Sequence, residues 1–154
     1  MRKLKTVQAL LLTAAICAGG ATRLMAQAAD QLAAAPAPQS VWNGVYSDSQ
    51  AYGGEKVSDT VCLGCHGAGL TGGDSGPRLV GEDFLGAWNG RPVSDLFDFI
   101  SVQMPENAPG TLKKEDVASV IAYILKVNNM PAGKQALSTE HDALAPIALL
   151  AVKP

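Results

Sequence analysis

The sequence contains few residues that bind metal ions through nitrogen or sulfur. It has three cysteines and two histidines among 154 residues. A structural zinc site usually takes four Cys or His ligands. Because we expect Cys17 to be removed with an N-terminal segment, such a site would need His141 or carboxylates beside the remaining ligands. This shortage argues against a structural zinc site.

The N-terminus lacks a hydrophobic run long enough to span a membrane. A positively charged start at residues 2–5 is followed by an uncharged apolar run over residues 7–20, which is shorter than the roughly 20 residues of a spanning helix. Small residues follow, and residues 26–28 read Ala-Gln-Ala, which fits a cleavage site. This layout is typical of a secretory signal peptide. We therefore predict that residues 1–28 are removed on export to the periplasm.

Basic residues become scarce once this segment is removed. All four basic residues of the first part of the chain are lost with it, so the mature chain holds 8 basic against 14 acidic side chains, a formal charge of −6. An acidic protein of this kind is a poor ligand for nucleic acid. It can instead be steered towards a basic surface on a partner protein.

Neither internal repeats nor β-type alternation of useful length appears in the chain. Residues 29–40 are rich in Ala, Pro and Gln without a hydrophobic period, and we interpret them as a flexible leader. Order is expected to begin at Val41. Ser47 or Asp48 can cap a first helix that runs to about Thr60, because both side chains accept free amide hydrogens.

Two glycines lie inside this first helix. Gly53 and Gly54 each cost roughly 1 kcal/mol against alanine. Such a cost suggests a compensating contact, in which a glycine lets another helix approach closely. The alternative is a frayed or interrupted helix.

Three further helices are predicted in the second half of the chain. Residues 82–88 form a short helix that Asn89-Gly90 ends, and Pro92 begins another that runs to Ser101. The clearest helix follows Leu112, which can act as its hydrophobic staple. Its apolar stripe consists of Val117, Val120, Ile121, Ile124 and Val127. The tail, residues 134–154, has scattered apolar residues and could lie across the domain.

Two of the three cysteines stand in a motif of known chemistry. Cys62-Leu63-Gly64-Cys65-His66 has the Cys-x-x-Cys-His spacing of c-type haem attachment. The two thiols add across the porphyrin vinyl groups, and the adjacent histidine is carried onto one face of the iron. A thioredoxin-like redox pair would need a βαβ context, and no strand-like run flanks Cys62. One covalent haem would also consume both thiols, which are a liability in an oxidising compartment.

A glycine-rich loop follows the motif, from Gly67 to Gly81. It lacks the Lys-Ser/Thr pair and the following apolar helix of a phosphate-binding loop. A loop that wraps closely round a flat cofactor is the better explanation for so much glycine.

A second iron ligand has to come from elsewhere in the chain. The candidates are Met104, Met130, His141 and the lysines. Met104 precedes a proline in a polar loop that could fold back over the second haem face. Met130 also precedes a proline, but it follows the long helix, where a methionine is more often core filler than ligand. We predict His66 and Met104 as the axial pair, on the known His/Met pattern; an open or His141-ligated iron is the alternative.

The order of these motifs resembles class I c-type cytochromes: haem motif, Gly-Pro-x-Leu, loop methionine and C-terminal helix. Most similar are small periplasmic domains that read Val-Trp-x-Gly-Val-Tyr before the haem motif and Asn-x-x-Pro-Ala-Gly after the last helix, here residues 41–46 and 128–133. The resemblance covers about residues 41–133. It implies an all-α, class I cytochrome c-like fold, in which about four to five helices and loops wrap the haem. It also implies that the first and last helices cross near Gly54 and Tyr123.

The resemblance further implies roles for residues around the haem. The carbonyl of Pro77 is expected to accept the free ring N–H of His66, the contact that fixes the tautomer of the ligand. Trp88 is similar to the family's aromatic near the haem propionates, and Arg91 is expected to pair with one of them.

Three positions depart from the family pattern. Ser58 stands where an aromatic usually packs between the terminal helices, so the crossing is expected to be looser. Lys113 replaces the usual Ser/Thr cap of the last helix, a loss of about 1 kcal/mol. Met130 replaces a typical aromatic. None of these residues is expected to touch the iron.

The resulting interpretation is a periplasmic electron-transfer protein with one covalent haem c, and not an enzyme. Its partners would be redox proteins, and the chain would be a monomer or a subunit of a dehydrogenase complex. One alternative is the electron-accepting cytochrome subunit of a periplasmic dehydrogenase, such as a quinoprotein dehydrogenase. Another is a haem enzyme or ligand sensor with a vacant iron site. The predicted divisions are residues 1–28, 29–40, a cytochrome c domain over 41–133, and a C-terminal extension over 134–154.

Overall fold

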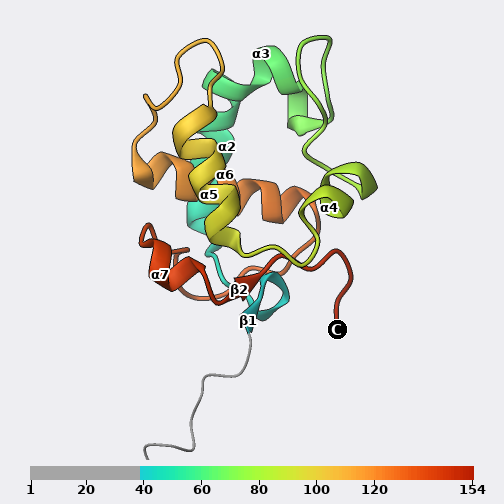
Figure 1. The fold of residues 1–154 in the computed structure, drawn as a ribbon, viewed down its shortest axis with the longest axis vertical. Helices are drawn as coiled ribbons and strands as arrows, with labels where there is room; N and C mark the ends of the chain where they lie inside the picture. Colours follow the sequence, from blue (N-terminus) through green and yellow to red (C-terminus); the bar gives the residue numbers. More distant parts are fainter. Residues whose placement is uncertain (1–38) are drawn as a thin grey trace, which may run out of the picture. The chain divides into compact units, whose positions relative to one another are not determined.

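The computed structural model describes residues 39–154 of the chain. The predicted signal peptide and most of the predicted leader lie outside the described residues. Within that range the fold is all-α except for one pair of two-residue strands, which confirms the expected fold class. Helix α6 (Lys114–Val127) lies at the centre, where α2 (Asp48–Val57) crosses it and α5 (Val93–Gln103) packs on it (Figure 1). No helix in residues 39–154 is long and apolar enough to cross a membrane.

Helix α2 (Asp48–Val57) makes the crossing with α6. It begins as predicted, because the Ser47 hydroxyl accepts a hydrogen bond from the Gln50 N–H at 3.3 Å. At the crossing, a Cβ on Gly54 would lie 1.8 Å from the carbonyl oxygen of Ser119. Only glycine therefore lets the two backbones approach this closely. The contact expected from the helix-internal glycine is confirmed, and the expected loosening of the crossing is not seen at this point.

The helical backbone continues beyond Thr60, where the sequence predicted its end. A π-helical turn, η2 (Ser58–Cys62), and helix α3 (Leu63–His66) follow α2 without a break in right-handed dihedral angles. The first breaker is Gly67, whose φ is 74°. The predicted end was wrong because the helical backbone passes through residues 58–66, Gly64 included, and is interrupted only at Gly67. The Cys-x-x-Cys-His motif consequently lies on helical backbone.

Helix α6 (Lys114–Val127) forms the centre of the core. Its cap residue Lys113 makes no side-chain hydrogen bond, in agreement with the absence of a Ser/Thr cap. Four of the five predicted stripe residues are buried, and Val127 is partly exposed. The buried surface is wider than the predicted stripe, since it also includes Ala118, Ala122, Tyr123 and Leu125.

Helices α4 (Glu82–Trp88) and α5 (Val93–Gln103) follow the sequence closely. α4 has the predicted bounds. Pro92 is the residue before the first turn of α5 and not part of that turn, and α5 continues two residues beyond Ser101. Asn128, at the end of α6, accepts the N–H of Gly81 and donates to the carbonyl of Leu79, both at 2.9 Å. This side chain attaches the segment before α4 to the central helix.

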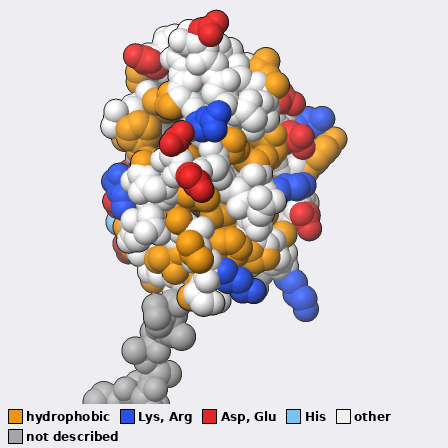
Figure 2. Space-filling view, turned by 90° about the vertical axis from the view of Figure 1, so that its right-hand side faces the viewer, with side chains coloured by type: hydrophobic (Ala, Val, Ile, Leu, Met, Phe, Trp, Pro, Cys, Tyr) orange, Lys and Arg blue, Asp and Glu red, His pale blue; other side chains and the backbone are white. Residues whose placement is uncertain are grey.

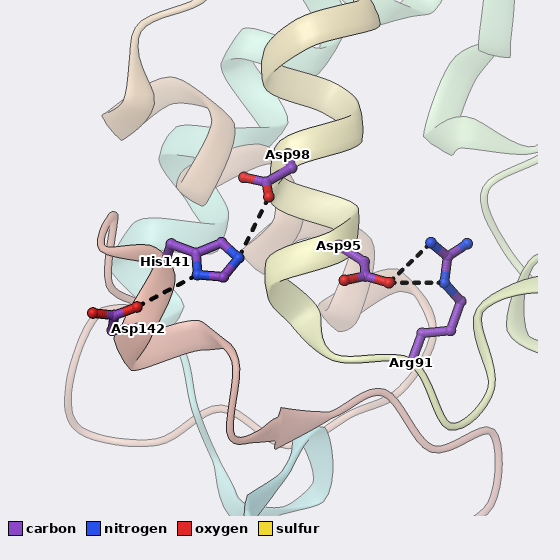
Figure 3. Close-up of polar contacts among 5 residues, drawn as sticks. All are labelled: Arg91, Asp95, Asp98, His141 and Asp142. Atoms are coloured by element: carbon purple, nitrogen blue, oxygen red, sulfur yellow. Dashed lines mark hydrogen bonds and ion pairs between the residues drawn. The ribbon is translucent and has the colours of Figure 1, made fainter.

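The C-terminal tail is an integral part of the described fold. It contains helix α7 (His141–Leu144) and strand β2 (Ile147–Ala148), which pairs in parallel with β1 (Gln39–Ser40). The assignment of the last two leader residues to flexible chain was therefore wrong. Leu144 and Leu149 are fully buried, so the tail contributes to the same core as the helices. His141 also approaches Asp98 of α5 at 3.5 Å (Figure 3).

Candidate functional site

Two cavities that share one wall lie beside the Cys-x-x-Cys-His motif. Their volumes are about 200 and 450 Å³, the larger within the range of small-molecule and cofactor sites, roughly 300–1,000 Å³. The residues that line both are His66, Pro77, Leu79, Ile100, Met104 and Ile124. The face of the molecule that carries α4 shows hydrophobic side chains exposed among charged ones (Figure 2). The wall therefore combines one imidazole and one thioether with aliphatic surface from α5 and α6.

Cys62 and Cys65 both line the smaller cavity, one helical turn apart. Both are free thiols, Cys62 partly buried and Cys65 exposed. Burial raises the pKa of the Cys62 thiol, a hydrogen bond with Ser58 opposes that rise, and the nearby Cys65 adds to it. The two thiols thus border the same cavity as the adjacent imidazole.

The glycine-rich loop packs back onto the motif that precedes it. A Cβ on Gly73 would lie 2.5 Å from the carbonyl oxygen of Cys65, and the Gly72 N–H donates to the carbonyl of His66 at 2.7 Å. These contacts let backbone pack closely on backbone, and the predicted wrapping of the loop round a flat cofactor stays a prediction. The fold-back brings Pro77 beside His66.

The ring of His66 is oriented by a single short hydrogen bond. Its Nδ1 lies 2.7 Å from the carbonyl oxygen of Pro77. A carbonyl can only accept, so the neutral imidazole carries its proton on Nδ1 and keeps the Nε2 lone pair free. This is the contact that the family resemblance implies, and it prepares Nε2 to bind a metal ion.

The two candidate methionines lie in different surroundings. Met104 follows α5 directly, its N–H donates to the carbonyl of Ile100 at 3.1 Å, and its side chain lines both cavities. Met130 is 3% exposed in the core, and its carbonyl accepts the buried Tyr46 hydroxyl at 2.7 Å. Neither Met130 nor His141 is among the residues that line the two cavities. The structure thus brings Met104, and not its rivals, to the same wall as His66.

Trp88 lines the larger cavity, and Arg91 contacts the Trp88 ring from outside that cavity. The Arg91 guanidinium lies 4.3 Å from the centre of the Trp88 ring. It also donates two hydrogen bonds to one carboxylate oxygen of Asp95, at 3.0 and 3.2 Å (Figure 3). Arg91 does not line either cavity. The pairing of Arg91 with a haem propionate, which the resemblance implies, stays a prediction.

Sequence reasoning missed several residues of the cavity walls. Arg78 and Asp83 line the larger cavity, and Glu106 and Asn107 line the smaller one. Arg78 could have been found, because it directly follows Pro77 in the Gly-Pro-x-Leu motif. Phe99 lines the larger cavity and packs edge-on to Trp88 with ring centres 5.8 Å apart. No sequence signal marked Phe99, which is 37% exposed.

The donor set of this site fits a covalently attached haem. Two thiols, one imidazole with a free Nε2 and one thioether border an apolar space, the groups that attach and ligate haem in His/Met proteins. No three His, Cys, Asp or Glu side chains of residues 39–154 converge as a metal-ion cluster. The two cysteines also lie on helical turns, far from the only strand pair of the described chain (Figure 1).

Comparison with known proteins gives one family and one structural relative. The family described as "Cytochrome C oxidase, cbb3-type, subunit III" matches residues 49–124, which include the motif and Met104 and end before the C-terminal tail. The crystal structure of the sulfane dehydrogenase SoxCD from Paracoccus pantotrophus is similar at 21% identity and a TM-score of 0.48. That match covers 70% of this chain and 61% of the other, so the chain spans less than two thirds of its relative. No curated protein sequence matches.

Proposed function

We propose, from the premise that this chain carries a class I c-type cytochrome domain, that it is a periplasmic carrier of single electrons with one haem c. In this proposal Cys62 and Cys65 attach the haem covalently, and His66 and Met104 ligate its iron. The observation that carries it is the His66 Nδ1 hydrogen bond to Pro77 at 2.7 Å, on the wall that Met104 also lines. It supports the assignment because a free Nε2 and a thioether border one space.

The bound haem would supply a metal centre that cycles between Fe(III) and Fe(II). The chain's own residues have three tasks around it. The Pro77 carbonyl holds the proton of His66 on Nδ1, so the ring would bind the iron through Nε2 in one orientation. As a ligand, the Met104 thioether would favour the reduced iron and so raise the redox potential. Ile100 and Ile124 provide aliphatic surface against which the haem would pack.

The sequence alternatives differ from this proposal in measurable ways. A haem enzyme or ligand sensor has a vacant iron position, so cyanide or carbon monoxide would bind to the wild-type protein without displacing a ligand. A cytochrome subunit of a dehydrogenase would co-purify with its catalytic subunit from the native periplasm. The shuttle proposal expects slow ligand binding and a chain that purifies alone.

Covalent attachment is the first prediction to test. The exported wild-type chain should retain haem stain after denaturing electrophoresis, and Cys62→Ala with Cys65→Ala should lose it, because no thioether can form. Ser58→Ala is the matched control, since it removes the hydroxyl that contacts Cys62 and leaves both thiols. The proposal fails if wild-type chain, made with intact attachment machinery, releases all its haem into acidified organic solvent.

A further inference from the structure

The end of the C-terminal tail is bonded to the turn between α4 and α5. The N–H of Gly90 donates to the carbonyl of Leu149 at 2.7 Å, and the N–H of Leu149 donates to the carbonyl of Arg91 at 2.8 Å. The Asn89 side-chain oxygen accepts the N–H of Ala151 at 2.9 Å. We call residues 147–151 the C-terminal strap. These three bonds fix both ends of the turn to it.

The strap is itself firmly held by the rest of the fold. Its first two residues pair with β1, and Ile147 and Leu149 are buried in the core. The carbonyl of Leu150 accepts the indole N–H of Trp42 at 2.9 Å. The strap therefore presents fixed backbone groups to the turn and is not a free chain end.

The turn in question carries the aromatic wall of the larger cavity. Trp88 is the last residue of α4, and its carbonyl accepts the Arg91 N–H at 3.1 Å across the turn. Arg91 in turn stacks on the indole and is held by Asp95, the first-turn acid of α5 (Figure 3). A displacement of Asn89 or Arg91 would move the indole against the cavity. A continuous chain of contacts therefore connects the strap, through residues 89–91 of the turn, with Trp88.

We propose that the C-terminal strap is a positioning element of the cofactor site, and that Asn89 is the positioning residue through which it orients Trp88. This inference rests on the proposed haem site. The strap lies beyond the residues that match the cytochrome family, 49–124, so the wall of the site depends on chain outside the matched region.

The test uses the complete exported holoprotein and follows the Trp88 indole N–H by NMR in the oxidised and reduced states. Paramagnetic iron displaces resonances of nearby protons, so the oxidised-minus-reduced shift reports where the indole lies relative to the haem. Asn89→Leu should change that shift and speed amide exchange at Gly90 and Leu149 about fivefold, the expected effect of one lost hydrogen bond. Asn89→Asp keeps the acceptor oxygen and should restore the wild-type values. Ala151→Pro removes the donor of the same bond from the exposed tail and should reproduce Asn89→Leu.

Gln50→Leu is the matched control for general loosening of the tail. Gln50 makes two hydrogen bonds to the backbone of Leu137, at 2.7 and 3.0 Å, on the α2 side of the molecule. The Gln50→Leu substitution should leave the oxidised-minus-reduced shift of the Trp88 indole N–H unchanged. An unchanged Trp88 shift in Asn89→Leu and Ala151→Pro, or an equal change in Gln50→Leu, would overturn the inference alone. A wild-type Trp88 without any dependence on oxidation state would overturn the haem placement, and the inference with it.

Discussion

Two methionines followed by proline compete for one role, and their surroundings separate them. Met104 borders the cavities beside His66, whereas Met130 is buried with its carbonyl bonded to Tyr46. The sequence already favoured Met104, because a polar loop can fold back and a helix end usually closes on a hydrophobic side chain. The structure adds that Met104 and His66 line the same two cavities, which could not be predicted from their spacing in the sequence.

Met104→Ala should abolish the weak near-infrared sulfur-to-iron(III) band, lower the redox potential and open the iron to exogenous ligands, because the thioether is lost. Met130→Leu is the control and should leave all three properties unchanged, since the volume of the core side chain is nearly conserved. Absorption spectra, potentiometry and cyanide titration measure these effects. Loss of the band in Met130→Leu with its retention in Met104→Ala would contradict the assignment.

Arg91 shows where prediction at the residue scale reaches its limit. Its guanidinium pairs with Asp95 and stacks on the Trp88 indole, while its pairing with a haem propionate stays a prediction. The i, i+4 spacing of Arg91 and Asp95 was visible in the sequence. The stacking on Trp88 was not visible, because it depends on which way the turn between α4 and α5 points the Arg91 side chain.

Among the elements, helix α2 contains two adjacent glycines, one in contact with α6 and one not. Substituting each of them distinguishes the effect of helix propensity from the effect of packing. Gly54 meets the backbone of α6, while a Cβ on Gly53 has nothing within 4 Å. Gly54→Ala should lower the free energy of unfolding by about 3 kcal/mol, because backbone atoms must shift to admit the methyl group. Gly53→Ala should raise it by about 0.5–1 kcal/mol through helix propensity alone. Denaturant unfolding of the holoprotein measures both; equal effects of the two substitutions would mean that the crossing is not close at Gly54.

The bounds of helices were predictable where a capping or breaking residue marked them. Ser47 marked the start of α2, and Asn89 marked the end of α4. The predicted end of the first helix, near Thr60, falls inside the π-helical turn that follows α2. That turn has no local sequence signature, and it carries the chain into the haem motif by continuous helical angles. The two-residue strands were also missed, since pairing between Gln39 and Ile147 is set by the folded tail and not by local alternation.

For the whole molecule, the all-α fold and the crossing of the first helix with the long helix α6 were predicted, whereas the role of the tail was not. Apolar residues such as Leu144 and Leu149 were visible in the sequence, but they are scattered and show no periodicity that predicts a helix or a strand. They are buried because the tail packs against α5 and pairs with β1. Long-range packing of this kind leaves no repeating pattern in the chain.

The excess of acidic side chains leads to a prediction about partner binding. The mature chain is predicted to carry a charge of −6, and exposed acids such as Asp74 and Glu82 lie on the segments that follow the haem motif. If the redox partner is basic, attraction raises the association rate and weakens as the screening length shrinks to about 10 Å at 0.1 M salt. The second-order rate of electron transfer should therefore fall steeply between low and physiological ionic strength.

Asp74→Asn with Glu82→Gln should flatten this salt dependence, because two charges near the cavities are removed while neither side chain lines them. Asp48→Asn with Glu140→Gln is the matched control: it changes the net charge equally at exposed positions that belong to neither cavity. Stopped-flow rates against ionic strength measure both variants. If the two pairs flatten the dependence equally, only net charge acts on association. A wild-type rate that is indifferent to salt, or that rises with it, would mean that docking is apolar and that the acidic surface serves solubility, since screening of opposite charges can only slow the encounter.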